Sequence, residues 1–328
     1  MPADRRRSEP RHVVIAVFPG LQSLDAVGPL EVFASASRVA EGLGLPGRYR
    51  VSLVSSGGRP VRTESGLELS AAPLPDGPVD TLLLPGGDGV HDARRDDELI
   101  GWVRRTAPLA RRVATVCTGT FLAAEAGLLD GHTVTTHWAR AERLQREFPG
   151  LTVDPDPIYV HDGRVWTSAG VTAGIDLALA MVQDDLGTEV AQTTARWLVM
   201  FLHRPGGQTQ YSAPVWVPRA ERSTVRAVQA LVEAAPGGDH TVPAMAAAAA
   251  MSVRHFSRVF TAEVGEPPGR YVERVRVEAA RRDLETTGDT LDVIATRCGF
   301  GTAETMRRSF RRRLGVAPDA YRRRFRVA

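Results

Sequence analysis

Four short apolar runs in the first 117 residues constrain the fold of this chain more than any other feature. They are rich in β-branched residues and lie at 12–18 (HVVIAVF), 49–56 (YRVSLVSS), 80–87 (DTLLLPGG) and 111–117 (RRVATVC). Pro-Gly or Ser-Gly ends the first two, and their continuous apolar character is typical of strands covered on both faces. Helix-like stretches at 28–41 and 96–108 lie between the runs. This alternation predicts an α/β fold with a largely parallel sheet.

Length and composition indicate the class of protein. The chain has 328 residues, of which 43% are hydrophobic and 24% are charged, so we expect about two folded domains. The two cysteines, Cys117 and Cys298, lie far apart, which argues against a disulfide framework and indicates a reducing compartment. The apolar run from 13 to 18 is too short for a signal peptide or a membrane span. We therefore predict a disordered leader over residues 1–10, a cytoplasmic location and no membrane partner.

Several chemically useful residues follow predicted strands. Asp25 follows the first strand, Gly86 and Gly87 follow the third, and Cys117 ends the fourth. Because the carboxyl ends of parallel strands share one edge of a sheet, we expect these residues to form one site. Cys117 lies where a strand turns into a helix, and the positive end of a helix favours a thiolate.

The neighbours of Cys117 suggest roles in such a site. Backbone N–H groups near Gly87 and Thr118 are expected to bind an anion or a developing oxyanion. Asp25 is expected to hydrogen-bond the sulfur or to move a proton, provided that burial keeps its carboxyl partly protonated. His137, in the segment HTVTTHW, is a further candidate for the same pocket.

Structural roles remain open for the same residues. A small cysteine packs well at a crowded turn without reacting, so Cys117 has a purely structural alternative. Asp25 is placed where it would also cap a helix beginning near Gly28. For His137 the alternative is a partly buried histidine with no part in binding.

A stretch rich in proline and glycine divides the chain. Residues 199–219 carry three prolines and a Gly-Gly pair, which is typical of a domain edge. We therefore predict one domain over 11–202, a linker over 203–219 and a second domain over 220–328.

Charge is distributed unevenly between the two parts. From residue 240 onward there are 17 arginines and 10 acidic residues, whereas residues 1–239 carry 24 arginines and 28 acidic residues. A basic domain behind a mildly acidic one is typical of a nucleic-acid-binding module, although a solvated basic face has the same composition.

Two segments of the second domain share one pattern. Residues 242–265 and 291–315 each predict a short apolar helix, a tight turn and a second helix that is basic on one face, with a connecting helix over 267–287. This is the plan of a helix-turn-helix motif, so we predict an all-α domain with two such motifs. The residues expected to face base edges and phosphates are Arg254, Ser257 and Arg258 in the first copy and Glu304, Thr305, Arg308, Arg311 and Arg312 in the second.

The inward positions of these helices follow helical spacing. They are Val253, Phe256 and Phe260 in the first copy, Ala303, Met306 and Phe310 in the second, and Val277, Ala280 and Leu284 in the connecting helix. Thr302 is predicted to cap the second basic helix.

The first domain resembles the ThiJ/PfpI superfamily, which is related to class I glutamine amidotransferases, over about residues 11–200. The motifs that carry the resemblance are FPGLQSLDAVGPLEVF, TLLLPGG, VCTGTFLAAEAGLLDGHTVTTHW and VWTSAGVTAGIDLAL. The resemblance implies a flavodoxin-like sandwich. It matches Cys117 to the superfamily's cysteine, Asp25 to its acidic partner, and Gly86 and Gly87 to its Gly-Gly turn. Thr118 replaces the histidine that protease-like and glyoxalase-like members often have, which removes the nearest general base. Isonitrile hydratases of this superfamily also lack that histidine.

The second domain resembles the AraC/XylS-type DNA-binding domain over residues 220–326. The motifs are MSVRHFSRVF, PPGRYVERVRVEAAR and IATRCGFGTAETMRRSFRRRLGVAPDAYRRRF. The resemblance implies two recognition helices in successive major grooves, and it places Cys298 in the core. The combination of both domains resembles the GlxA family of transcriptional regulators.

The sequence therefore predicts a DNA-binding transcriptional regulator, and not an enzyme, whose first domain senses a small metabolite. The residues expected to bind this effector are Asp25, Gly86, Gly87, Cys117, Thr118 and His137. The expected partners are double-stranded promoter DNA, a small-molecule effector, a second copy of the chain in a homodimer, and RNA polymerase. No metal and no cofactor are predicted. The alternative is a cysteine-dependent hydrolase or isonitrile hydratase-like enzyme that carries a DNA-binding domain, with Cys117 and Asp25 as its catalytic residues. A third hypothesis is oxidant sensing through Cys117.

Overall fold

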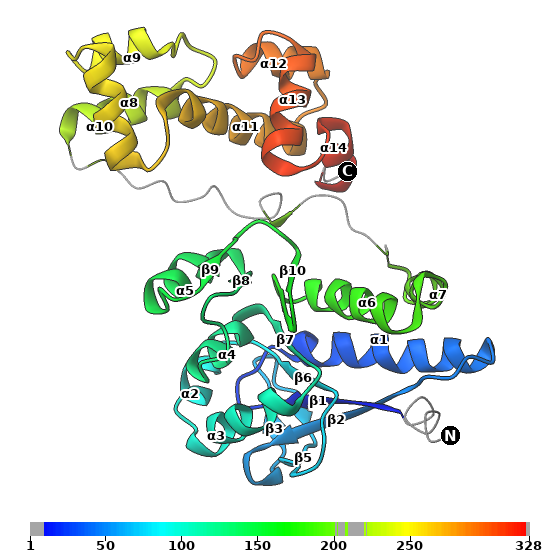
Figure 1. Ribbon diagram of the computed structural model, residues 1–328. Coiled ribbons are helices and arrows are strands. Elements are labelled where there is room, and N and C mark those ends of the chain that lie inside the picture. The colour runs from blue at the N-terminus through cyan, green and yellow to red at the C-terminus, as the bar shows by residue number, and fades with distance from the viewer. Residues whose placement is uncertain (1–9, 201, 203–206, 209–219, 221, 326–328) are drawn as a thin grey trace. The chain divides into compact units, whose positions relative to one another are not determined.

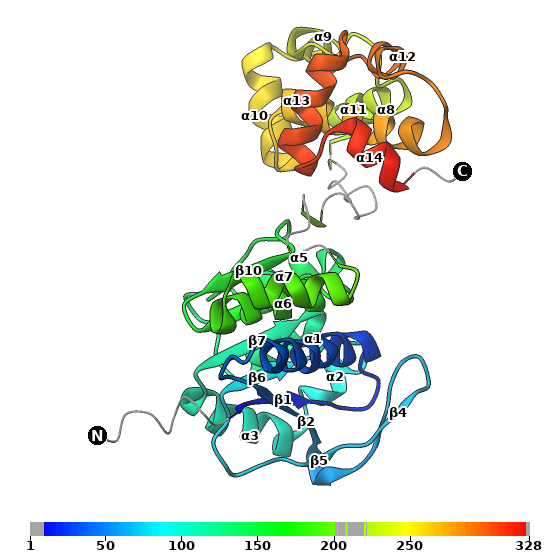
Figure 2. The same ribbon diagram turned by 90° about the vertical axis from the view of Figure 1, so that its right-hand side faces the viewer.

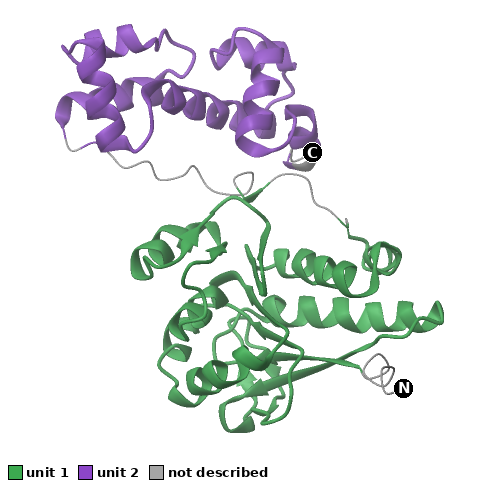
Figure 3. Cartoon of the chain, viewed as in Figure 1, with its two compact units in different colours: residues 1–208 green, residues 209–328 purple. Residues whose placement is uncertain are grey.

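The chain forms two units, residues 1–208 and residues 209–328 (Figure 3). A computed structural model describes residues 10–200, 202, 207–208, 220 and 222–325. The predicted leader lies outside the described residues apart from residue 10, and the predicted linker lies outside them apart from residues 207 and 208.

A seven-stranded sheet forms the centre of the first unit (Figure 1). Its strands are β1 (Arg11–Ala16), β2 (Tyr49–Ser55), β5 (Ala72–Pro73), β6 (Thr81–Leu84), β7 (Arg112–Val116), β10 (Tyr159–Asp162) and β11 (Val165–Ser168). They are ordered β10-β11-β7-β6-β1-β2-β5, and every neighbouring pair is parallel except β10 and β11. The largely parallel α/β sheet is confirmed, with an antiparallel edge strand that the sequence did not predict.

Helices cover both faces of this sheet. They are α1 (Ser23–Gly42), α2 (Val90–Ala93), α3 (Asp97–Thr106), α4 (Thr120–Glu125), α5 (Ala141–Glu147), α6 (Ala173–Leu186) and α7 (Thr188–Trp197). α1, α6 and α7 pack together on one face, and α3 and α4 lie on the other (Figures 1 and 2). Because both faces are covered, Val13 to Ala16 and Leu82 to Leu84 are fully buried, which explains their unbroken apolar runs.

Short elements connect this framework. Two small sheets pair β3 (Val61–Arg62) with β4 (Glu68–Leu69) and β8 (Thr133–Val134) with β9 (Thr152–Val153). The single-turn helices are η2 (Ser56–Gly58), η3 (Ala107–Leu109), η4 (Cys117–Gly119) and η5 (Trp138–Arg140). No helix among the described residues is both long enough and apolar enough to cross a membrane.

The second unit is helical over its described residues. It contains α8 (Ser223–Ala234), α9 (Val242–Ala248), α10 (Val253–Val264), α11 (Pro268–Thr286), α12 (Leu291–Arg297), α13 (Ala303–Leu314) and α14 (Pro318–Phe325). The pairs α9–α10 and α12–α13 pack into two separate hydrophobic cores. α11 contributes Tyr271 and Val272 to the first core and Val277 and Leu284 to the second. The two predicted helix-turn-helix motifs and their connecting helix are therefore present.

The predicted inward residues of these motifs are buried with one exception. Phe256, Phe260, Met306 and Phe310 are completely buried. Val253 is 46% exposed, so its inward assignment is wrong. Ser252 caps α10, so Val253 is the first residue of the helix and lies at its exposed amino end. The first residue of α13 is Ala303, which is buried, so the two copies differ at this position.

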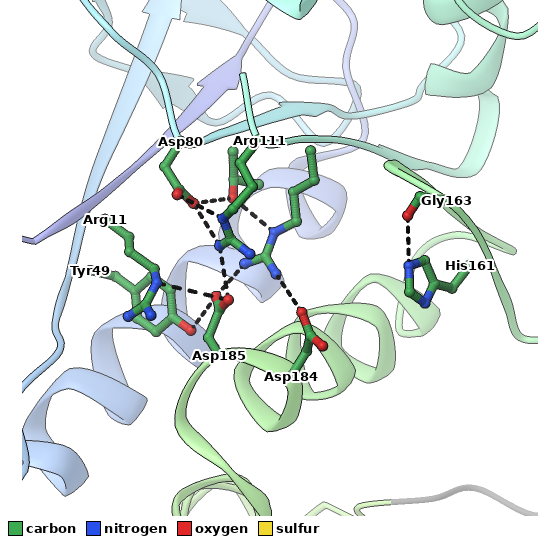
Figure 4. A network of polar contacts seen from close by, with 10 residues as sticks. Arg11, Tyr49, Asp80, Arg111, His161, Gly163, Asp184 and Asp185 are labelled. Carbon is green, nitrogen blue, oxygen red and sulfur yellow. Dashed lines mark hydrogen bonds and ion pairs between the residues drawn. The ribbon is translucent and has the colours of Figure 1, made fainter. Parts of the chain in front are cut away.

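A buried ionic network ties α6 to the amino ends of the strands (Figure 4). Asp185, near the end of α6, has a side chain that is only 2% exposed. Its carboxylate accepts hydrogen bonds from Arg112 Nη2 at 2.5 Å and from the Tyr49 hydroxyl at 2.8 Å, and it forms an ion pair with Arg111 at 2.8 Å. The Arg112 side chain is equally buried, so each charge depends on the other for its solvation.

We expect Asp185→Ala to lower the free energy of unfolding by about 3–5 kcal/mol, because it leaves the Arg112 guanidinium buried without its carboxylate. Asp184→Ala is the matched control, since the Asp184 side chain is 54% exposed and surface pairs contribute about 1 kcal/mol or less. Urea denaturation followed by tryptophan fluorescence measures both values. Equal losses in the two variants would contradict a structural role for the buried carboxylate.

Candidate functional site

The turn after β7 places Cys117 at the carboxyl edge of the sheet. Cys117 has φ +57°, a left-handed conformation that residues other than glycine rarely adopt. Two glycines leave room for this turn. A Cβ atom on Gly86 would lie 2.5 Å from the Thr118 nitrogen, and one on Gly170 would lie 2.6 Å from Cys117 Sγ. The sharp strand-to-helix turn therefore depends on backbone from two neighbouring loops.

Asp25 connects these loops to α1. Its carboxylate is completely buried and accepts hydrogen bonds from the Gly86 N–H at 3.0 Å and from the Val171 N–H at 2.8 Å. Asp25 does not cap a helix, because α1 begins at Ser23 and its cap is the Gln22 side chain. The structure thus brings Asp25, Gly86 and Cys117 together, as the sequence predicted, and adds Val171.

Burial controls the protonation of this site. Burial raises the pKa of Asp25 to about 7, and the N–H donors of Gly86 and Val171 oppose this rise only in part. The Asp25 carboxyl is therefore partly protonated near neutral pH, as expected. Burial also raises the pKa of the Cys117 thiol well above its ordinary value, and the charge of Asp25 adds to the effect. Burial therefore opposes the thiolate that the positive end of the following helix was expected to favour.

The Thr118 hydroxyl binds backbone groups of Gly87, whose N–H was expected to face a ligand. Its Oγ1 accepts a hydrogen bond from the Gly87 N–H at 2.9 Å and donates to the Gly87 carbonyl at 3.1 Å. The Gly86 N–H is bound by Asp25. An anion at this turn would therefore have to displace the Thr118 hydroxyl to reach the Gly87 N–H.

His137 follows Thr136, whose side chain contacts the cysteine turn. Its Nδ1 accepts a hydrogen bond from the Ala139 N–H at 3.3 Å, and burial together with the charge of Arg140 lowers its pKa. Thr136 instead donates from Oγ1 to the Cys117 carbonyl at 2.7 Å. The assignment of His137 to the pocket stays a prediction, and Thr136 is a contact that the sequence did not predict.

The site thus offers a thiol whose pKa is raised by burial and a carboxyl whose pKa lies near neutrality. Residues missed from the sequence are Gly170, Val171 and Thr136, although the motifs SAGVTAG and TVTTHW contain them. Within the part of the chain that the structure describes, no group of three or more His, Cys, Asp or Glu side chains is placed to hold a metal ion.

The second helix of each helix-turn-helix motif presents a second candidate site. Arg258 and Arg308 are exposed and occupy the same position, six residues after the caps Ser252 and Thr302. The predicted cap is confirmed, because Thr302 Oγ1 accepts a hydrogen bond from the Thr305 N–H at 3.2 Å. Equivalent exposed cations in both motifs form a repeated basic surface.

The remaining predicted contact residues are not equally available. Arg254, Arg308 and Arg311 are exposed and form no hydrogen bond or ion pair through their side chains with another described residue. Arg312 is paired with Glu273 of α11, and Glu304 lies 3.7 Å from Arg307. Ser257 and Thr305 are half-buried, while Cys298 is buried, as predicted.

Comparisons with known proteins agree with this division of the chain. The profile of the DJ-1/PfpI family matches residues 11–184, and the profile of a helix-turn-helix domain matches residues 245–324. The HTH-type transcriptional regulator Rv1931c of Mycobacterium tuberculosis is 43% identical over 280 residues, which cover 77% of this chain and 98% of that protein. The HTH-type transcriptional regulator GlxA of Rhizobium meliloti is 29% identical, with 84% and 86% covered. The isonitrile hydratase of Pseudomonas putida is 38% identical over 180 residues, which cover 54% of this chain and 72% of that protein.

The raised pKa of Asp25 predicts a pH dependence of stability. Between about pH 4 and pH 7 the folded chain keeps a proton on Asp25 that the unfolded chain has released, so the free energy of unfolding falls as pH rises through this window. We expect Asp25→Asn to remove a decrease on the order of 4 kcal/mol. Urea denaturation at several pH values measures the slope. Asp92→Asn, which removes a carboxylate whose side chain is 91% exposed, should keep the slope of the unmodified chain. Parallel pH profiles for the chain and Asp25→Asn would contradict the assignment.

Proposed function

Because the chain belongs to the DJ-1/PfpI family and carries a helix-turn-helix domain behind that fold, we propose that it is a DNA-binding transcriptional regulator whose first unit senses a small metabolite. Both family resemblances identified from the sequence are confirmed by the matched profiles and by the relatives. The observation that carries the proposal is the equivalent placement of Arg258 and Arg308 on the exposed faces of α10 and α13.

The geometry of the second unit supports DNA as the partner. Two helices of equal length, joined through the cores that share α11, present guanidinium groups at one repeated position. Guanidinium groups donate to phosphates and in pairs to the acceptors of guanine, which suits promoter DNA. Arg254, Arg308 and Arg311 are the strongest candidates, because each has a side chain that no described residue neutralises.

The first unit supports effector binding at the cysteine turn. Asp25, Gly86, Gly87, Cys117 and Thr118 form one connected set of hydrogen bonds around a strained turn. A ligand that exchanges hydrogen bonds with this set would favour one arrangement of the turn, and this preference is what transmits a signal.

The proposal also includes the oligomeric state of the chain and its action with RNA polymerase. We include a homodimer, because closed two-fold pairs are the commonest oligomers and would suit paired binding sites, and action with RNA polymerase at promoters in the cytoplasm. Light scattering coupled to size-exclusion chromatography tests the oligomer.

The first experiment is genome-wide sequencing of DNA that the purified full-length chain protects, repeated for Cys117→Ala. Discrete protected sites near promoters support the regulator. No specific sites in either protein would overturn it.

We expect Arg308→Ala to weaken binding to a protected fragment by about 1–3 kcal/mol and to relax the preference at one base position, because a guanidinium group contacts that base. Arg308→Lys keeps the charge and should retain affinity for unrelated DNA while losing the preference. Competition binding with single-base variants of the fragment measures both effects. A uniform loss across all sequences would assign Arg308 to the phosphate backbone instead.

Residual turnover at Cys117 is a second candidate function, favoured by the similarity to the isonitrile hydratase of Pseudomonas putida and by the contact between Asp25 and the thiol. Against it, burial raises the pKa of the thiol that would have to act as nucleophile.

Alkylation with iodoacetamide across pH separates these functions. We expect the apparent pKa of Cys117 in the native chain to lie above about 8.5, the value of free cysteine. Mass spectrometry distinguishes Cys117 from Cys298, and alkylation in urea is the control for both thiols. An apparent pKa below about 8.5 would instead favour turnover at Cys117.

A further inference from the structure

Gln208 is buried in the first unit, although the sequence placed it in a linker. It is the last residue of the first unit, and its exposed fraction is only 2%. Eleven residues separate it from Ala220, the first described residue of the second unit. The position of Gln208 therefore sets where the chain leaves the first unit on its way to the DNA-binding helices.

The side chain of Gln208 is bound on both ends of its amide. Its Oε1 accepts a hydrogen bond from the Trp138 N–H at 2.8 Å. Its Nε2 donates to Thr135 Oγ1 at 3.0 Å, to the Thr136 carbonyl at 2.9 Å and to the Pro157 carbonyl at 3.2 Å. These partners require one donor end and one acceptor end, which the side-chain amide supplies.

The backbone around Gln208 fits the same socket. The Gln208 N–H donates to the Asp156 carbonyl at 2.6 Å. A Cβ atom on the preceding Gly207 would lie 2.3 Å from Asp156 Oδ1, so a larger residue could not enter as closely. The contact is therefore built from both residues of a Gly-Gln pair and not from the side chain alone.

Two hydrogen bonds lead from this socket to the cysteine turn. Thr136, whose carbonyl accepts from Gln208, donates from its own Oγ1 to the Cys117 carbonyl at 2.7 Å. A second route runs through Thr120, whose Oγ1 lies 3.2 Å from the Cys117 carbonyl and 3.1 Å from the Thr135 carbonyl. Thr135 and Thr136 are completely buried, so a shift at one end leaves polar groups without partners unless the other end moves as well.

We propose that Gln208 couples the cysteine turn to the DNA-binding unit. The two states are Gln208 docked in its socket and Gln208 released, and an effector bound at the Cys117 turn favours release by displacing Thr136. This inference rests on the proposed function and adds its regulatory connection. Because coupling between two sites is reciprocal, releasing Gln208 must also loosen the cysteine turn, even when no effector is present.

The test uses the full-length chain and hydrogen exchange. Gln208→Glu keeps the size of the side chain but directs carboxylate oxygen at three acceptors, so it should release the socket. We expect exchange of the Trp138 amide to rise about tenfold or more, and exchange in the segment 117–120 to rise with it. Gln183→Glu, on a partly exposed part of α6, is the matched control and should change neither segment.

A second pair of variants changes Thr136, whose side chain contacts the cysteine turn. Thr136→Val removes the hydroxyl bonded to the Cys117 carbonyl but keeps the backbone carbonyl that binds Gln208. We expect protection of the Gln208 and Trp138 amides to fall in this variant and to return in Thr136→Ser, which keeps the hydroxyl. Because this pair leaves Gln208 unchanged, it also tests the coupling if Gln208→Glu fails to fold.

The affinity for a protected DNA fragment measures whether the coupling affects function. Relative to Gln183→Glu, both Gln208→Glu and Thr136→Val should change the Kd for a protected fragment by about fivefold or more. If the fragment is bound but exchange at the far end and Kd both stay unchanged, the coupling is overturned and the regulator stands. If no specific DNA is bound by the unmodified chain, the proposed function fails, and the exchange measurements still decide whether the two ends are coupled.

Discussion

A single buried carboxylate organises the edge of the sheet on which the candidate effector site depends. Asp25 lies in the first turn of α1 and binds the N–H groups of Gly86 and Val171, which follow two other strands. The strained turn of Cys117 packs between these loops. No arginine among the described residues forms an ion pair with this carboxylate. Burial therefore raises its pKa, and the two N–H donors that hold the loops oppose this rise only in part.

At the amino ends of the strands, a second buried carboxylate, that of Asp185, is stabilised in a different way. Asp185 is equally inaccessible, but three arginines and a tyrosine hydroxyl surround it, so its charge is compensated. Such a network stabilises the packing of α6 against the strands and has no reason to respond to a ligand. The carboxyl beside Cys117 has a pKa raised by its surroundings, which is typical of functional sites.

The second unit repeats one design around a shared helix. α11 gives three buried residues to the first core and four to the second, so the two motifs are held at a defined spacing by one helix. The basic positions Arg258 and Arg308 inherit that spacing. Gln208 provides the complementary constraint in the first unit, where it holds the chain against the threonines that support the cysteine turn.

The sequence by itself determined four strands of the main sheet and the repeated helix-turn-helix motif, because apolar periodicity, glycine turns and caps such as Thr302 are local properties of the chain. It also placed Asp25 and Cys117 at one edge, since parallel strands end together. Only the tertiary structure decided that burial raises the pKa of the Cys117 thiol, that Thr118 binds the Gly87 N–H and that Gln208 belongs to the first unit. These properties depend on burial and on contacts between residues distant in the chain, which no local pattern contains.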